Sequence, residues 1–324
     1  AIVDQSSNAF TITVNGNSKV SAFTPFTAYN AAQPFNRNTS NSAPGVWTMD
    51  QVDYYMSQNQ WPMPYSYPLQ SLRFNSADSA YLSRTPSVAG NRQKWTFSTW
   101  VKRGDSTSPE SDIFSAGSAS NAWAGIYFVA TTGVLALYSE ASVGNTTYNL
   151  QTTQVFRDVG AWYHIVVAYD STQATAADRI KIYVNGVQVT SFTTATYPAL
   201  NSSAGWVNST TAHAIGRLYD GAAAYYSNIY LAETYLVDGQ QLTAASFGAN
   251  DANTGVWSPI VYTGTYGTNG FHLTFQNNTG TTATTLGYDW SGTGNNWTPN
   301  NFSVAAGSGN DVLTDSPTNF GTDN

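Results

Sequence analysis

The sequence predicts an all-β protein, an antiparallel two-sheet jelly-roll sandwich with one short helix and short extended N- and C-terminal flanking segments. Aromatic residues make up 14% of the 324 residues and charged residues only 10%. Aromatic and β-branched side chains fit half-buried pleated surfaces, while Gly, Asn and Ser supply turns. Short apolar runs also alternate with turn residues at even spacing, which is typical of a sandwich.

Residues 1–68 are expected to form an N-terminal flanking segment. Alternating residues on both sides of an Asn-Gly-Asn turn predict a hairpin within Phe10–Phe26. Thr48 and Gln51 have the spacing of a capping box, so we expect a short helix that ends before Pro62.

Residues 69–275 are expected to form the jelly roll, because strand-like runs follow one another there. Its organising feature is Asn185-Gly186, which suits a type I′ turn between Ile180–Val184 and Val187–Thr190, with Trp162–Tyr169 as the neighbouring strand. The other expected strands are Ser71–Asn75, Ala80–Ser83, Trp95–Lys102, Ile113–Ser115, Ala124–Ala130, Val134–Ser139, Thr147–Gln151, Ala212–Leu218, Ser227–Val237 and Phe271–Phe275.

Residues 276–324 are expected to form an extended C-terminal arm. Earlier in the chain, Thr243 could cap a one-turn helix that runs through Phe247. The arm is rich in Gly, Asn, Ser and Thr and has few apolar residues. Because segments 1–45 and 285–324 would bury little alone, they are candidates for ordering against neighbouring subunits, and we expect self-association as a homo-oligomer.

Composition excludes several classes of partner. The net charge is −7 and there is no basic run, so no nucleic-acid footprint is present. No apolar stretch of membrane-spanning length occurs. With no cysteine, a disulfide scaffold, a Cys-based zinc site and a thiol nucleophile are excluded.

Several motifs together resemble the concanavalin A-like lectin/glucanase superfamily in its LamG/pentraxin branch, from about Leu69 to Phe275. The resemblance implies a two-sheet jelly roll and depends on the order of five short motifs. They are W-x-F-x-x-W-V-K at Trp95–Lys102, A-W-Y-H-I-V-V at Ala161–Val167, I-K-I-Y-V-N-G at Ile180–Gly186, I-G-R at Ile215–Arg217 and L-V-D-G-x-x-L-T-x-x-x-F-G at Leu236–Gly248.

The flanking motifs resemble those around LamG-like domains in structural proteins of tailed phages, especially marine ones. They include Trp257-Ser-Pro, the segment Ser291–Phe302 and Asp315-Ser-Pro-Thr-Asn. The last pattern is usually internal in such proteins, so the chain is expected to be a processed or truncated product. This resemblance implies a component of the virion surface.

No catalytic residues are expected. Glycosidases of this fold use paired carboxylates, in a Glu-x-Asp-x-x-Glu pattern on one strand. Here Glu110, Glu140 and Glu233 lie far apart, without a second acid at that spacing. The three histidines are also isolated, and His164 within an apolar strand is expected to be a packed, hydrogen-bonded imidazole. No G-x-S-x-G nucleophile elbow occurs.

A bound Ca²⁺ is implied by the resemblance, since several members of the superfamily hold this ion through Asp, Asn and backbone oxygens. The candidate ligands are Asp170, Asp220 and Asp251, which the sequence places in loops, as it does Asp178. No run matches a known Ca²⁺-binding loop such as the EF-hand, so each is better explained as a turn residue.

Glycan binding needs exposed aromatic faces beside polar groups that orient sugar hydroxyls. Five loop aromatics are candidates, with packing under a loop as the alternative: Trp123, Trp206, Tyr219, Tyr225 and Tyr226. Trp95, Trp100 and Trp162 lie in apolar strands and are expected in the core.

We therefore expect a non-enzymatic virion surface or structural protein of a phage, as a fibre, appendage or capsid decoration, with glycan or host-surface binding as an added role. Its partners would be other virion proteins and a cell-surface glycan. The alternative is a secreted bacterial carbohydrate-binding module or adhesin. A glycanase would require Glu140 or Glu233 to face a second carboxylate across a cleft.

Overall fold

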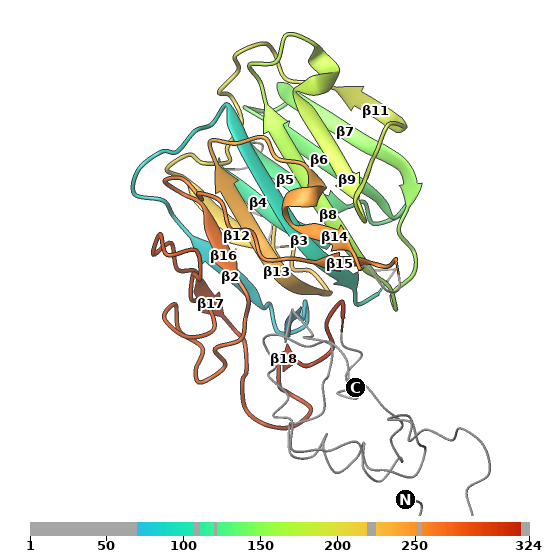
Figure 1. Cartoon of the computed structure of the whole chain (residues 1–324). Helices are drawn as coiled ribbons and strands as arrows, with labels where there is room; N and C mark the ends of the chain where they lie inside the picture. The colour runs from blue at the N-terminus through green and yellow to red at the C-terminus, as the bar shows by residue number, and fades with distance from the viewer. Residues whose placement is uncertain (1–69, 106–110, 120–121, 219–224, 252–254, 319–324) are drawn as a thin grey trace, which may run out of the picture. The chain divides into compact units, whose positions relative to one another are not determined.

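The computed structural model describes residues 70–318, apart from 106–110, 120–121, 219–224 and 252–254 (Figure 1). The chain divides into two units, Ala1–Ser66 and Tyr67–Asn324, and the description concerns the second. The predicted hairpin within Phe10–Phe26 and the predicted helix from Thr48 lie outside the described residues.

Two large antiparallel sheets form the sandwich, as predicted. Sheet A has the order β10-β9-β8-β3-β13-β1-β18, and β16 also pairs with β13. Its strands are β1 (Ser71–Phe74), β3 (Lys94–Arg103), β8 (Trp162–Asp170), β9 (Ile180–Val184), β10 (Val187–Gln188), β13 (Ile229–Asp238), β16 (Phe271–Leu273) and β18 (Val312–Leu313).

Sheet B has the order β11-β7-β6-β5-β4-β12-β2-β17 and is stacked against sheet A (Figure 1). Its strands are β2 (Tyr81–Arg84), β4 (Ser111–Ala119), β5 (Ala122–Phe128), β6 (Val134–Glu140), β7 (Thr146–Val155), β11 (Phe192–Thr196), β12 (Ala212–Ile215) and β17 (Thr298–Asn300). Two short strands, β14 (Gly248–Asn250) and β15 (Trp257–Pro259), pair with each other, and two single-turn 3₁₀ helices span Ala176–Asp178 and Ala244–Ser246.

The core lies between the inner faces of the two sheets. Alternate residues of each strand point inward, because successive side chains of a strand point to opposite faces. Trp95 is buried there and stacks on Tyr169, with the ring centroids 5.2 Å apart. Trp100 is buried too, but on the outer side of sheet A against His164, and Trp162 is only half-buried. The core prediction is therefore confirmed for Trp95 and Trp100, whereas Trp162 is not a core residue.

The predicted tight turn between β9 and β10 is confirmed. Asn185 and Gly186 both have positive φ, at 47° and 84°, as a type I′ turn requires. The Asn185 Oδ1 atom accepts a hydrogen bond of 2.7 Å from the His164 backbone N–H, which ties the turn to β8. Strand β9 therefore ends at Val184, directly before the Asn-Gly pair that predicts the turn.

The segment after β13 covers the outer face of sheet A, where β14 and β15 cross in front of it (Figure 1). A second apolar cluster forms between this cover and the sheet, with Val166, Tyr183 and Tyr235 packed on Phe247 and Trp257. This layer buries the part of the outer face of sheet A that carries Val166, Tyr183 and Tyr235.

His164 lies in this layer as a packed imidazole, as predicted. The Trp257 Nε1–H donates to its Nδ1 atom at 3.0 Å, so the Nε2–H donates to the Ser98 hydroxyl at 2.9 Å. Burial lowers the pKa of His164 to about 3. Burial likewise lowers the pKa of His213 to about 4, and its ring accepts the Asn208 backbone N–H. Both histidines are therefore neutral in the folded protein.

Stability is expected to fall as the pH drops below the ordinary histidine range. The unfolded chain takes up protons at His164 and His213 near pH 6.5, whereas the folded chain resists them until about pH 3 and 4. The free energy of unfolding should therefore decrease on the order of 3–5 kcal/mol between about pH 7 and about pH 4.5. Denaturant titrations at several pH values measure this slope. His164→Gln, which cannot titrate, should show about half of it, and an unchanged slope would contradict the assignment.

The C-terminal segment differs from the expected extended arm. It contributes β17 to the edge of sheet B, where Pro299 lies opposite Leu82, and β18 to the edge of sheet A, where Val312 lies opposite Leu72. Trp297 is buried in the core between the sheets. The few apolar residues of this segment therefore attach it to the sandwich. The average composition of the segment is polar and does not predict this.

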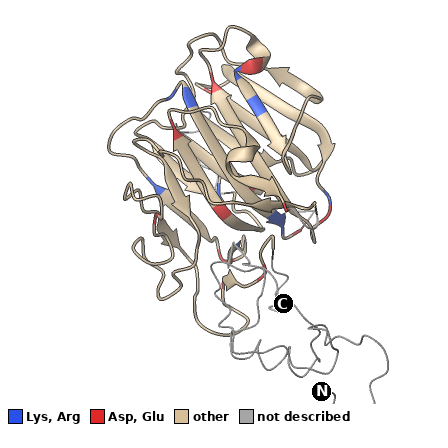
Figure 2. Cartoon of the chain, viewed as in Figure 1, with Lys and Arg blue, Asp and Glu red and all other residues tan. Residues whose placement is uncertain are grey.

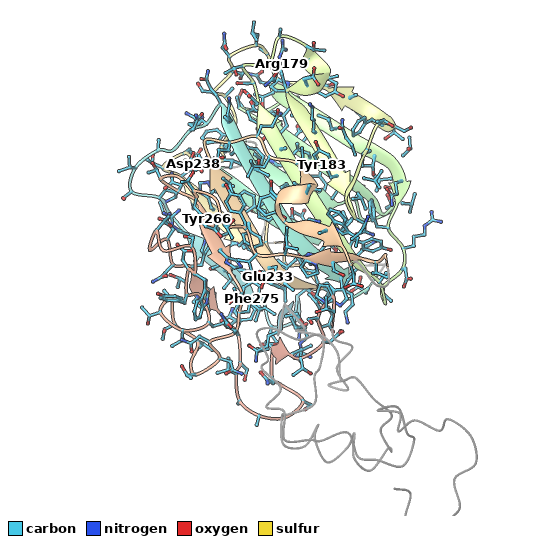
Figure 3. The ribbon with its side chains drawn as sticks, in the orientation of Figure 1. Arg179, Tyr183, Glu233, Asp238, Tyr266 and Phe275 are labelled. Atoms are coloured by element: carbon cyan, nitrogen blue, oxygen red, sulfur yellow. The ribbon has the colours of Figure 1, made fainter. Side chains whose placement is uncertain are left out.

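Glu233 occupies an unusual backbone position in β13, at an irregularity in its pairing with β3 between Ala232 and Tyr235. Its φ is +51°, which is uncommon for a residue with a side chain. Glu233, labelled in Figure 3, is buried. Its carboxylate accepts hydrogen bonds from the Tyr235 hydroxyl at 2.7 Å and from His272 Nε2 at 2.6 Å. This bulge thus joins β13 to β16 through a buried polar cluster.

Among the described residues, no helix has the length and apolar character that crossing a membrane requires. Acidic and basic residues are scattered along the ribbon rather than grouped (Figure 2).

Candidate functional site

The outer face of sheet B presents the candidate site. In β5, Ala124, Ile126 and Phe128 belong to the core, so Trp123 and Gly125 point outward. The same alternation turns Tyr138 of β6 and Asn149 and Gln151 of β7 outward. These side chains are half-buried rather than covered.

Trp123 lies flat along this face because Gly125 has no side chain. A Cβ atom on Gly125 would come within 2.9 Å of the Trp123 ring, so the indole occupies the space above the glycine. The Tyr138 ring lies 5.0 Å from the indole and the Tyr127 ring 6.0 Å from it. Two tyrosines therefore hold the indole in place as an aromatic platform.

Glu140 lies beside Trp123, opposite it in the pairing of β5 with β6. The Tyr138 hydroxyl donates to the Glu140 carboxylate at 3.0 Å. Burial raises the pKa of Tyr138, and the Glu140 charge adds to this effect, so the phenol keeps its proton at neutral pH. Trp206 reaches the same place from its loop, where its Nε1–H donates to the Glu140 carbonyl at 2.7 Å.

Amide and hydroxyl side chains continue the face beyond the aromatic platform. Asn149 lies opposite Tyr138, and Gln151 follows two residues later on the same side. On the edge strand β11, Thr194 and Thr196 lie opposite Gln151 and Asn149. Because amides and hydroxyls both donate and accept hydrogen bonds, this row can pair with a polar, uncharged ligand.

The predicted aromatics separate into two groups. Trp123 lies opposite Glu140 on the outer face of sheet B, and Trp206 donates to the Glu140 carbonyl while it packs against the core. Tyr225 and Tyr226 instead follow β12, beyond Ile215. There Tyr226 packs on Tyr81 with ring centroids 5.7 Å apart. The Arg217 guanidinium lies over both of these rings, at 4.9 and 5.4 Å. Tyr226 thus packs on Tyr81 and Arg217, Tyr225 is exposed, and Tyr219 lies outside the described residues.

The candidate Ca²⁺ ligands do not converge in the part of the chain that is described, where no group of three or more His, Asp or Glu side chains occurs. Burial would raise the pKa of Asp170, but hydrogen bonds from Thr172, Lys94 and Gln173 outweigh it and lower the pKa. The Asp170 carboxylate thus accepts hydrogen bonds from Thr172 in the turn after β8 and pairs with Lys94. Asp220 lies outside the described residues, and Asp251 closes a turn through its backbone.

A hydrolytic centre on this face would need two carboxylates. Strands β5, β6, β7 and β11 carry a single acidic residue, Glu140. Glu233 lies on sheet A and contacts His272 and Tyr235, and Glu110 is outside the described residues.

The sequence reasoning missed the residues that complete the face: Gly125, Tyr138, Asn149, Gln151, Thr194 and Thr196. The signal was present in the alternation of β6 and β7, since every second residue of a half-buried strand points outward. What alternation does not reveal is which of the two outward faces stays uncovered.

Residues 75–228 match the family model described as the concanavalin A-like lectin/glucanases superfamily. No curated protein matches the sequence. Similar solved structures include a SAP-like pentraxin from Limulus polyphemus, with 14% identity over 54% of this chain and 77% of the pentraxin, at a TM-score of 0.39.

A putative carbohydrate-binding protein from Bacteroides ovatus is similar over 72% of this chain, with 14% identity and a TM-score of 0.43, and the match spans 58% of that protein. The enzymatically active domain of tailspike protein 2 from bacteriophage CBA120 is similar over 55% of this chain and 26% of its own length, with 13% identity and a TM-score of 0.39.

Proposed function

We propose that this chain, whose residues 75–228 match the model of the concanavalin A-like lectin/glucanases superfamily, is a carbohydrate-binding protein that holds a glycan on the outer face of sheet B without cleaving it. The observation that carries the proposal is the aromatic platform: the Trp123 indole lies over Gly125, with Tyr138 beside it and a row of amides and hydroxyls beyond.

This arrangement matches what a sugar requires. The C–H face of a pyranose ring packs on an aromatic face, and its hydroxyls need donors and acceptors at the side. Trp123 supplies the first, while Asn149 and Gln151 supply the second. The acidic residues on the strands of sheet B are Asp112 on β4, opposite Tyr127, and Glu140 on β6, opposite Trp123. Four residues along β5 and two strand spacings separate them, about 16 Å, which exceeds the about 5–9.5 Å of a catalytic carboxylate pair and supports binding rather than hydrolysis.

Trp123→Ala is expected to weaken glycan binding at least about tenfold, because the stacking surface is lost. Affinity electrophoresis through gels that contain soluble polysaccharides measures the change. Trp290→Ala is the matched control, since Trp290 is an exposed tryptophan outside sheet B and its loss should leave binding unchanged. Gly125→Ala should act like a mild form of Trp123→Ala, because its methyl group would displace the indole. Equal binding by the Trp123 and Trp290 variants would contradict the proposal.

We place this binding protein on the surface of a phage particle, as a fibre, appendage or capsid decoration, on the strength of its flanking motifs. Asp315-Ser-Pro-Thr-Asn and Ser291–Phe302 support this placement through their resemblance to phage structural proteins. Quantitative mass spectrometry of purified particles tests it. A copy number near that of the major capsid protein would indicate decoration, and a few tens of copies or fewer a fibre or tail component. Absence from particles would overturn the placement and leave a secreted carbohydrate-binding protein.

A further inference from the structure

We infer that the outer face of sheet B selects an uncharged glycan, and that it binds an internal stretch of the polymer rather than a chain end. The inference rests on the proposed function and specifies its ligand class. Two features carry it: the charge of the strands that form the face, and the position of β11 at the edge of the sheet.

No cation stands on the strands of the site. The sequences of β5, β6, β7 and β11 contain no Lys and no Arg. Recognition of a carboxylated or sulfated sugar uses Arg or Lys, whose charge-assisted hydrogen bonds offset the cost of desolvating the anion. These strands offer only neutral donors to a ligand.

Two described arginines near these strands make contacts of their own. Arg92 donates to the Gly205 carbonyl beside Trp206, and Arg217 stacks on Tyr81 and Tyr226 beyond Ile215. Ile215 pairs with Phe114, three residues of β4 away from Gly117, which pairs with Trp123. At roughly 3.3 Å per residue, the cross-strand row that contains Ile215 lies about 10 Å from the row that contains Trp123. Arg217 lies further still from Trp123.

On strands β5, β6, β7 and β11 the single charged side chain is an acid. Glu140 lies opposite Trp123, and its carboxylate accepts the Tyr138 hydroxyl. An anionic sugar stacked on Trp123 would approach this carboxylate, so like-charge repulsion would oppose its binding. A neutral sugar meets no such penalty, because its hydroxyls can donate to the carboxylate.

The row of polar side chains runs across the strands to an edge. Tyr138, Asn149 and Thr196 succeed one another on β6, β7 and β11, and β11 is the last strand of sheet B. With about 4.8 Å between neighbouring strands, the row from Trp123 on β5 to β11 is about 14 Å long. Thr196 at its end is exposed, so a polymer can continue past the edge. A site for a chain end would need a wall there.

The test compares soluble neutral polysaccharides, a β-glucan, a xylan and a galactomannan, by affinity electrophoresis of the full chain. The best binder is then compared with the same polymer after oxidation of its primary hydroxyls to carboxylates, or, for xylan, with a glucuronic acid-substituted form. We expect the protein to bind the anionic form at least about tenfold more weakly than the neutral form at about 50 mM NaCl. Its affinity for the neutral form should change less than about twofold when NaCl is raised to about 500 mM. Glu140→Gln should reduce the difference between the affinities for the neutral and the anionic polymer, because it removes the charge that repels the anionic one.

An oligosaccharide of the best polymer, blocked at both ends, tests the internal mode and should bind within about twofold of the unblocked form. Tighter binding of the anionic polymer, or loss of most affinity in salt, would overturn the uncharged class. Failure of the blocked oligosaccharide would overturn the internal mode. Both results would leave glycan binding itself intact. If no polymer, neutral or anionic, retards the protein, or if Trp123→Ala leaves the retardation unchanged, the proposed function fails instead.

Discussion

Replacing Trp297 with alanine is expected to lower the free energy of unfolding by about 3–5 kcal/mol, the usual range for removing a buried tryptophan. Trp297 is 1% exposed and lies between the two sheets. Its ring lies 5.0 Å from that of Phe271 in β16 and 6.4 Å from that of Phe114 in β4. The indole therefore fills space that neither sheet can fill alone.

The control for this prediction is Trp290→Ala in the same segment. Trp290 is 45% exposed and contacts the ring of Tyr288, so its loss should cost no more than about 1 kcal/mol. Equilibrium unfolding in denaturant, followed by circular dichroism, measures both variants. Similar losses for the two would mean that the C-terminal segment does not dock on the sandwich as the structure shows.

Replacing Glu233 with alanine is expected to lower the free energy of unfolding by about 2–5 kcal/mol, because the buried donors of Tyr235 and His272 lose a shared acceptor. Glu233 is 1% exposed, so water cannot replace the carboxylate without opening the layer above it. The variant also keeps a side chain at a φ of +51°, so alanine relieves none of the backbone strain.

Two variants of the same residue type control this second prediction. Glu233→Gln retains an acceptor oxygen and should lose less than Glu233→Ala. Glu140→Ala removes a carboxylate that accepts one hydrogen bond, from Tyr138, and should cost about 1 kcal/mol. Thermal or denaturant unfolding of the three variants ranks them, and an equal loss for Glu233→Ala and Glu140→Ala would contradict the role of the buried cluster.

Most strands could be predicted from the sequence because their signals are local. Trp95–Lys102 and Ile180–Val184 are apolar, β-branched or aromatic runs, and both are strands. Asn185-Gly186 specifies its turn through the positive φ that both residues tolerate. By contrast, β17 and β18 are two or three residues long and come from a Gly- and Asn-rich segment. Only their long-range pairing with β2 and β1 makes them strands.

The candidate site was predictable only in part, since Trp123 and Trp206 were selected as loop aromatics but their neighbours were not. A Trp in a sequence does not disclose whether it lies over a glycine, as Trp123 lies over Gly125. Tyr226 met the same criterion as Trp123, yet it packs on Tyr81 and Arg217. The difference depends on cross-strand neighbours that are distant in the chain.

The sequence by itself determined the all-β class, the order of most strands, the tight turn at Asn185-Gly186 and the scarcity of acidic and basic side chains. These follow from residue type and from alternation within a few residues. Only the tertiary structure decided which face of the sandwich is covered. The segment after β13 packs Phe247 and Trp257 on sheet A, while Tyr138, Asn149 and Gln151 on sheet B stay half-exposed. Alternation fixes the side of a strand to which a residue points, but packing between distant segments fixes what lies above that side.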